Sequence, residues 1–440
     1  MFSNDSMMEL FSPDERLRSM LNFEAALARA EAKIGLIPAE AASTIVKVCA
    51  EGVFDTLALS SRAASAGNLA IPLLQELIAQ TRKVSVEAAR YIHMGATSQD
   101  VIDTGLVLQL RPAVSLLEKD VRRIEQAFAE LAREHASTLL LGRTLLQPGP
   151  PIVFGLKAAG WFAAVRRGRQ RLETAARKGL FLQFGGAVGT LSSLGDHGLA
   201  VAEALAAELE LPLPEAPWHS HRDRVVELAS SVAILVGSLG KIARDISLNM
   251  QPEIGELAEP AGKGRGGSSA MPHKRNPVGC MNILAAANRT PGLLSSLLSG
   301  MMQEHERGLG GWQAEWATFP EIFQAAAGAT SAMVVVSEGL EVNVEAMRAN
   351  LEATNGLTFS EALASALIPN LGRSEAHELV ERLAEEVVVS GKNLALMASE
   401  DSTVTACLTE VELNRVFDPR EALGSAGAMI DRLLEGEEFK

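Results

Sequence analysis

The sequence predicts an all-α protein in which long helices pack into a bundle, and three observations carry that prediction. Apolar residues recur at steps of three and four over long segments, which is the period of one helix face. Alanine and leucine dominate while only 4% of residues are aromatic, and such side chains suit close-packed helices better than β-sandwiches. Short strands do not alternate with helices, so a doubly wound sheet is not expected.

Five segments are long enough for several helical turns and form the expected centre of the bundle. Their approximate bounds are 105–141, 152–178, 224–250, 282–302 and 312–347. We expect Pro291 to kink the fourth, because proline removes a backbone donor. The third carries no charge over 228–240. A helix that is apolar all round is buried on every side, in a bundle centre or between subunits.

Proline and glycine clusters separate these helices and suggest the domain organisation. At 440 residues, two or three domains are expected. We predict a helical N-terminal domain (1–104), a central long-helix bundle (105–350) and a helical C-terminal domain (351–440). The last contains shorter, more charged helices, such as 374–390.

Composition excludes several classes of protein. The formal net charge is −14 and no long basic run is present, which disfavours nucleic-acid binding. The three cysteines lie far apart without metal-ligand spacing, so neither a disulfide framework nor a metal site is expected. The first residues do not resemble a signal peptide, and the uncharged 228–240 stretch is too short to span a membrane. We therefore expect a cytoplasmic protein.

Four polar stretches interrupt the helical pattern: HMGATSQD (His93 to Asp100), GRTLLQ (Gly142 to Gln147), WHSHRDR (Trp218 to Arg224) and GKGRGGSSAMPHKRN (Gly262 to Asn276). Each has a purely structural interpretation. The first is typical of a helix N-cap, the second of a helix C-cap, and the last of a linker. Taken singly, these structural interpretations are favoured.

The glycine-rich stretch has the strongest case for chemistry. Successive glycines let backbone N–H groups converge into an anion-binding nest, to which Lys274 adds a charge and Asn276 a neutral donor. Such a setting stabilises the dianion formed when a proton leaves a carbon beside a carboxylate, and it activates the Ser268 hydroxyl as a base. The P-loop order is absent, so nucleotide binding is not expected.

The histidines and methionines need separate treatment. His273 is expected to be a structural hydrogen-bond partner, whereas neutral His93 could donate to a carboxylate substrate. His219 and His221 would diverge on a helix, so a metal pair is not expected and one of the two should be solvated. Met271 is typical of packing.

Together the stretches resemble the fumarase/aspartase superfamily, whose signature GSSxMPxKxN is matched by GSSAMPHKRNP. HMGATSQD and GRTLLQ match its other two shared regions in the same order, and the resemblance covers essentially the whole chain. It implies a three-domain, all-α protomer and a homotetramer with a twenty-helix core. Each active site would then take its motifs from three protomers. No cofactor is implied.

The resemblance also implies the site residues. Ser268 matches the catalytic base, and Lys274 matches the substrate-binding lysine and is the second catalytic candidate. Arginine suits bidentate carboxylate contacts, which adds arginines near the motifs as anchors. The expected substrate-binding set is His93, Thr97, Ser98, Arg143, Thr144, Gln147, Arg222, Ser269, Met271, Arg275 and Asn276, with Lys263 and Arg265 as further candidate anchors.

One departure indicates the reaction. Many superfamily lyases carry a histidine where this chain has Leu145, and that histidine helps to protonate the leaving group. A carboxylate leaving group needs no general acid, so lactone formation from a muconate tricarboxylate is favoured over adenylosuccinate cleavage. Several stretches, including LQFGGAVGTL and QEHERGLGGWQAEW, are most similar to the cycloisomerase branch. His221 departs from the glutamine usual there. A substituted muconate, another lyase reaction and a non-enzymatic scaffold stay open as alternatives.

Overall fold

The computed structural model describes residues 3–262, 266–267, 270–271 and 273–435, and the chain is mostly helical. By its internal contacts it divides into two compact units. Unit 1 comprises Met1–Asp120, Gly168–Leu239 and Asn282–Ser331, and unit 2 comprises Val121–Arg167, Gly240–Met281 and Ala332–Lys440. The domain boundaries expected after residues 104 and 350 stay a prediction.

The long helices that the sequence predicts are present among the described residues, and each contributes residues to both units. They are α6 (Ser98–Glu134), α7 (Phe154–Gly179), α9 (Asp223–Asn249), α10 (Val278–Gly300) and α11 (Gly311–Glu338). The prediction for α9 is confirmed to within one residue at each end. Pro291 lies inside α10, which continues on both sides of it.

Two predicted helices end earlier than expected. The segment expected to stay helical to residue 141 leaves the helix at Glu134, and a hairpin follows, made of β1 (Leu139–Thr144) and β2 (Gln147–Val153). The β2 sequence QPGPPIV is rich in proline, which cannot donate to a ladder and is therefore confined to strands with a free edge. The segment expected to reach 347 ends at Glu338, and β3 (Leu257–Ala258) pairs with β4 (Glu341–Val342) just beyond it.

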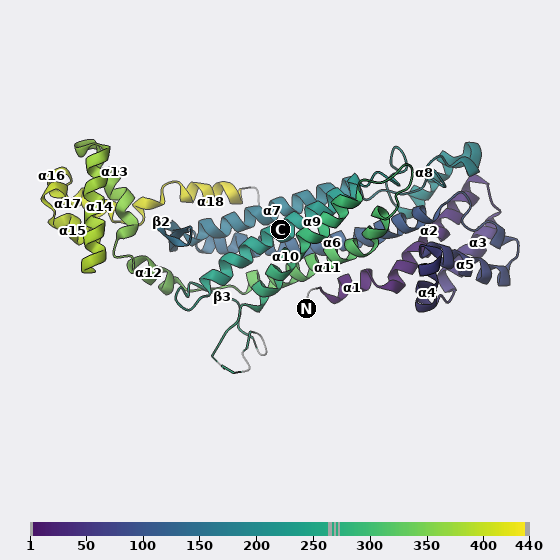
Figure 1. Cartoon of the computed structure of the whole chain (residues 1–440), viewed down its shortest axis with the longest axis horizontal. Helices are drawn as coiled ribbons and strands as arrows, with labels where there is room; N and C mark the ends of the chain where they lie inside the picture. Colours follow the sequence, from purple (N-terminus) through teal and green to yellow (C-terminus); the bar gives the residue numbers. More distant parts are fainter. Residues whose placement is uncertain (1–2, 263–265, 268–269, 272, 436–440) are drawn as a thin grey trace. The chain divides into compact units, whose positions relative to one another are not determined.

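Unit 1 also contains a group of shorter helices, with α2 packed against α3 and α8 (Figure 1). They are α1 (Asp5–Leu10), α2 (Pro13–Ile34), α3 (Ala39–Glu51), α4 (Thr56–Ala66), α5 (Ala70–Val84), η1 (Ala88–Arg90), η2 (Ser192–His197) and α8 (Gly198–Leu209). Ser12 caps α2 by accepting from Glu15 N, and Gly35 ends it in the left-handed conformation that glycine adopts without strain.

Unit 2 includes the C-terminal helices, of which α13 to α17 gather around their own apolar core (Figure 1). The elements are α12 (Val344–Glu352), η3 (Leu357–Phe359), α13 (Ser360–Leu371), α14 (Arg373–Ser390), α15 (Leu394–Glu400), α16 (Ser402–Cys407), α17 (Glu410–Val416), η4 (Glu421–Leu423) and α18 (Ala426–Leu434). Leu363, Leu367 and Leu394 are fully buried there. The helix predicted at 374–390 is confirmed as α14.

In the single chain, helix α9 is not buried on every side. Leu228, Val232 and Leu239 are fully buried, but Ile234 is 48% exposed in the single chain. Helices α9 and α11 are long and apolar enough to cross a membrane by length and composition, although most of each apolar window is buried in the protein. Such burial is typical of the core helices of a soluble protein.

Candidate active site

The four polar stretches form two groups, one in each unit. In unit 1, HMGATSQD leads into α6 and WHSHRDR leads into α9, and buried side chains join the two. In unit 2, GRTLLQ forms the turn of the β1–β2 hairpin, and the glycine-rich stretch lies between β3 and α10. The expected site residues are therefore distributed over both units.

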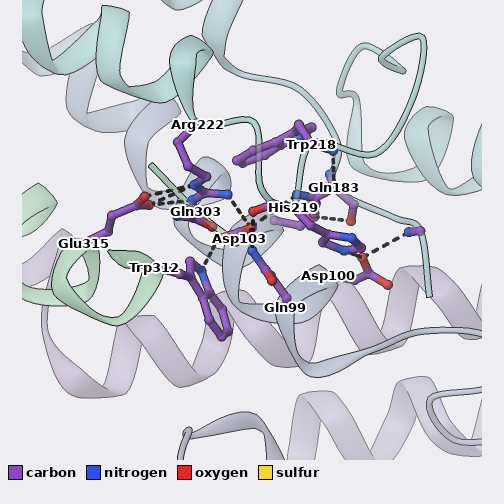
Figure 2. Close-up of polar contacts among 12 residues, drawn as sticks. Gln99, Asp100, Asp103, Gln183, Trp218, His219, Arg222, Gln303, Trp312 and Glu315 are labelled. Atoms are coloured by element: carbon purple, nitrogen blue, oxygen red, sulfur yellow. Dashed lines mark hydrogen bonds and ion pairs between the residues drawn. The ribbon is translucent and has the colours of Figure 1, made fainter. Parts of the chain in front are cut away.

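Asp100 is the buried centre of the group in unit 1 (Figure 2). Its Oδ1 accepts hydrogen bonds from Gly185 N at 3.0 Å and His219 Nε2 at 2.7 Å. Its Oδ2 accepts from Gly186 N at 2.9 Å and Thr97 N at 3.0 Å. One carboxylate thus holds the start of α6 against two segments that are distant in the sequence.

The two histidines of WHSHRDR lie in different environments. His219 is 3% exposed and bonds Asp100, whereas His221 is exposed. The prediction that one of them is solvated is confirmed. Among the described residues, no group of three or more His, Cys, Asp and Glu side chains could hold a metal ion.

Arg222 is fully buried between two carboxylates (Figure 2). It donates to Asp103 at 2.7 and 3.1 Å and to Glu315 at 2.6 to 3.2 Å, and it lies 4.7 Å from the ring centre of Trp218. Burial alone would lower the pKa of Arg222, but the two carboxylates raise it overall, so the guanidinium stays charged. Burial, opposed by Arg222, raises the pKa of Glu315. These contacts make Arg222 part of the framework, and direct substrate contact by it stays a prediction.

His93 is held by a residue that sequence reasoning did not select. Its Nδ1 lies 2.7 Å from Oε1 of Glu24 on α2, and Glu24 is 2% exposed. Burial alone would lower the pKa of His93, but the charge and hydrogen bond of Glu24, with a smaller effect of Asp100, raise it overall. Glu24 reads in the sequence as an ordinary helical residue, since its partner is 69 positions away.

Thr97 directly precedes α6, and Ser98 is the first residue of that helix. The Thr97 hydroxyl accepts a hydrogen bond from Nη2 of Arg307, which also donates to Gly186 O at 3.4 Å. Arg307 was not among the selected residues. It lies in the polar, glycine-rich break between α10 and α11, a signal of the same kind as the four stretches that were selected.

In unit 2, Arg143 is engaged in a bidentate ion pair. Its two terminal nitrogens donate to Glu256 at 2.8 and 2.7 Å, and Glu256 is fully buried. Asn350 Nδ2 also donates to Glu256 at 2.8 Å. Bidentate pairing fixes the plane of the guanidinium and anchors the hairpin to the segment before β3.

The hairpin turn places two leucines in the left-handed region. Leu145 has φ 51° and is 97% exposed, and Leu146 has φ 66° and is 74% exposed. Positive φ at both central residues is the requirement of a type I′ turn, which glycine and asparagine normally meet. Thr144 and Gln147 face each other across this turn, and both are exposed. GRTLLQ is therefore a strained exposed turn, and the helix C-cap interpretation is wrong.

The described ends of the glycine-rich stretch are tied to each other. Asn276 N donates to Gly266 O at 2.8 Å, and Asn276 Nδ2 donates to Gly267 O at 3.4 Å. Gly266 has φ 65°, and a Cβ there would lie 2.7 Å from Asn276 O, so only glycine fits. Four expected site residues lie outside the described residues: Lys263, Arg265, Ser268 and Ser269.

The basic residues of this stretch differ in their partners. Lys274 and Met271 are exposed, and Lys274 N donates to Met271 O at 3.1 Å. Arg275 donates to Glu341 at 2.8 and 3.1 Å and to Glu259 O at 2.7 Å, and the hydrogen bond to Glu341 raises its pKa. Arg275 thus ties the loop to β4, whereas the exposed Lys274 ammonium suits contact with a ligand.

Comparison with known proteins decides the family. A family model described as "Lyase" matches residues 2–292, and one described as "Adenylosuccinate lyase C-terminus" matches residues 356–433. The chain belongs to the fumarase/aspartase lyase family. The resemblance carried by the three sequence motifs is therefore confirmed.

Relatives in this lyase family align over nearly the whole chain. A 3-carboxy-cis,cis-muconate cycloisomerase of Bradyrhizobium diazoefficiens is 50% identical and covers 100% of this chain and 97% of its own. One from Pseudomonas aeruginosa is 51% identical, with coverages of 97% and 93%. The crystal structure of the 3-carboxy-cis,cis-muconate lactonizing enzyme from Pseudomonas putida superposes with a TM-score of 0.92 at 47% identity, covering 98% of this chain and 97% of that one.

Proposed function

We propose that this chain is a 3-carboxy-cis,cis-muconate cycloisomerase that forms 4-carboxymuconolactone in the protocatechuate branch of the β-ketoadipate pathway. The observation that carries the proposal is identity of about half of all positions, over the full length, with relatives that bear this name. Leu145, at the position of the lyase histidine, agrees with it, because a carboxylate leaving group needs no general acid.

The reaction adds one substrate carboxylate across the substrate's own double bond and moves one proton to the neighbouring carbon. Read in the reverse direction, a base removes that proton, and Lys274 and Asn276 stabilise the negative charge that develops beside a carboxylate. Either Ser268 or Lys274 carries the proton, and the cycle needs no cofactor. Thr97, Ser98 and His93 bind a further carboxylate of the tricarboxylate substrate.

The remaining binding residues form the rest of the proposed site. Bidentate pairing with Glu256 orients Arg143 close to the turn of the hairpin, and the loop is anchored through Arg275. The other members of the proposed binding set are Thr144, Gln147, Arg222, Ser269 and Met271.

The protein acts as a cytoplasmic homotetramer with shared active sites and a three-domain protomer. Exposed apolar side chains on three long helices support this, because the interfaces of obligate oligomers are more hydrophobic than other protein surfaces. Ile234 on α9, Leu298 on α10 and Val335 on α11 are 48%, 49% and 44% exposed. Analytical ultracentrifugation tests the assembly, and a monomer at micromolar concentration would contradict it.

Substrate profiling of the purified protein tests the reaction. Loss of the diene absorbance of 3-carboxymuconate, without added cofactor, is the expected result. Fumarate release from adenylosuccinate, with no action on the muconate, would instead identify an adenylosuccinate lyase, and preference for a sulfonated muconate would move the assignment to that substrate.

Substitution of Ser268 tests its proposed role in proton transfer. Ser268→Ala should lower kcat by about 10²-fold or more, which is the usual contribution of a proton-transfer group. The control is Ser299→Ala on the exposed side of α10, whose kcat should equal that of the wild type. Full turnover by Ser268→Ala would exclude the serine as the base.

A further inference from the structure

Glu24 and His93 form a pair that joins helix α2 to the segment in front of α6. The Nδ1 to Oε1 distance is 2.7 Å, the Glu24 side chain is 1% exposed, and that of His93 is 18% exposed. A buried carboxylate is retained only with a partner that compensates for lost hydration, and His93 is the partner of Glu24.

The contact also determines which imidazole nitrogen remains available. An ionised carboxylate can only accept a hydrogen bond, so Nδ1 of His93 carries a proton and Nε2 is left for another partner. The backbone of His93 has φ 62°, a sparsely populated region for a residue with a side chain. Such strain is concentrated at functional sites, and Thr97 and Ser98 follow a few residues later.

The titratable groups nearest to Glu24, apart from His93, are neutral and do not neutralise its charge. Glu31 lies seven residues later on α2, and neither of its oxygens has a partner among the described residues. Burial, and then the charge of Glu24, raise the pKa of Glu31 to about 8, so it is neutral near pH 7. On α3, burial and Glu24 raise the pKa of the Cys49 thiol, which also stays neutral.

Other charges around the pair are paired, exposed or further away. On α8, Glu208 binds Arg29 of α2 at 2.6 Å. Asp100 on α6 acts on His93 with the same sign as Glu24 but more weakly. The remaining charged side chains on α1, α3, α4 and α8 are exposed: Asp5, Glu9, Glu40, Lys47, Glu51, Arg62 and Glu203. On α6, which approaches α2 where Gly105 lies next to Met20, the buried Asp103 is paired with Arg222.

We propose that Glu24 is a positioning residue that keeps His93 a cation and leaves the Nε2–H of His93 free to bind a substrate carboxylate. This proposal rests on the proposed function. The substrate is a trianion, and a cationic donor binds a carboxylate about twice as strongly as a neutral one. Thr97 and Ser98 add hydroxyl donors beside it. Glu24 thereby turns a histidine that burial alone would neutralise into part of the anion-binding site.

Glu24→Gln tests this proposal, because glutamine keeps the shape and the acceptor oxygen but removes the charge. The pKa of His93 is measured by deuterium exchange of its Cε1–H with mass spectrometry, since the tryptic peptide 91–119 contains His93 and no other histidine. We expect that pKa to fall in the full-length variant, because the charge of Glu24 that raises it is removed. At a pH between the two values, KM for 3-carboxymuconate should rise about tenfold or more, with kcat within about twofold.

Glu31→Gln is the matched control, since it changes the same kind of buried side chain on the same helix without touching His93. It should leave the pKa of His93 and KM at wild-type values near pH 7. An unchanged pKa of His93 in Glu24→Gln would overturn the proposal. A lowered pKa with unchanged KM would overturn the role in substrate binding.

The wild-type protein provides a test that does not depend on how the variant folds. A wild-type His93 that titrates at or below about 6.5 would overturn the proposal by itself. The exchange measurement also separates the two hypotheses. If the wild type fails to act on 3-carboxymuconate, the proposed function is wrong, while the pKa of His93 still decides whether Glu24 holds it as a cation.

Discussion

Replacing Glu31 with glutamine should make the protein more stable at neutral and alkaline pH. Glu31 is fully buried on α2, and neither carboxyl oxygen has a partner among the described residues. Burial first, and the charge of Glu24 second, raise its pKa from the ordinary 4.5 to about 8. The folded protein therefore holds a proton that the unfolded chain has already released.

The sign of the effect follows from this difference in proton binding. Between about pH 4.5 and 8 the folded state binds the proton of Glu31 and the unfolded state does not, so the free energy of unfolding falls as pH rises. The slope is at most about 1.4 kcal/mol per pH unit, and the full loss is at most about 5 kcal/mol. Glu31→Gln removes this loss because glutamine has no proton to release.

Chemical unfolding at pH 5, 6, 7 and 8, at one protein concentration, measures the effect. The variant and the wild type should be similar near pH 5, and the advantage of the variant should grow with each pH unit. Glu31→Leu should stabilise at every pH, because it also removes the unpaired polar atoms. Glu40→Gln on the exposed side of α3 is the control and should follow the wild type. A constant difference between Glu31→Gln and wild type across this range would refute the reasoning.

Two further predictions concern the framework of the site. Arg222→Met should lower the free energy of unfolding by about 3 to 5 kcal/mol in urea titration, since it leaves two buried carboxylates without their cation. Arg275→Ala breaks an ion pair that is half exposed and should lower the free energy of unfolding by less than about 1 kcal/mol. Equal losses of stability in Arg222→Met and Arg275→Ala would contradict this prediction. Leu146→Gly should raise Tm slightly, by relieving about 1 kcal/mol of left-handed strain, and a lower Tm would show that the leucine side chain is needed.

The features that sequence reasoning predicted well are those encoded locally. The apolar period and the flanking polar residues gave the bounds of α9, and the glycine and proline clusters marked the breaks between helices. The GSSAMPHKRN stretch is a contiguous motif, so its family could be identified without coordinates. Neither prediction depended on a contact between distant parts of the chain.

The features that were missed depend on distant contacts or on tolerated strain. The β1–β2 hairpin turns on Leu145 and Leu146, which lack the glycine or asparagine that normally signals such a turn. The partners of Arg222 lie 119 and 93 positions away, and Glu24 is separated from His93 by 69. A single sequence gives no sign of such pairings, because each residue is locally ordinary for a helix.

The saturated carboxylate of Asp100 has a mechanical consequence. Its two oxygens have room for about four hydrogen bonds, and the amides of Thr97, Gly185 and Gly186 together with His219 occupy all of that capacity. None of these segments can move alone without leaving a buried polar group unpaired, so they open and close as one cooperative unit. The first turn of α6 is therefore held rigid by Gly185, Gly186 and His219, which lie far along the chain. Slow local opening of this turn requires the hydrogen bonds of the Asp100 side chain to break.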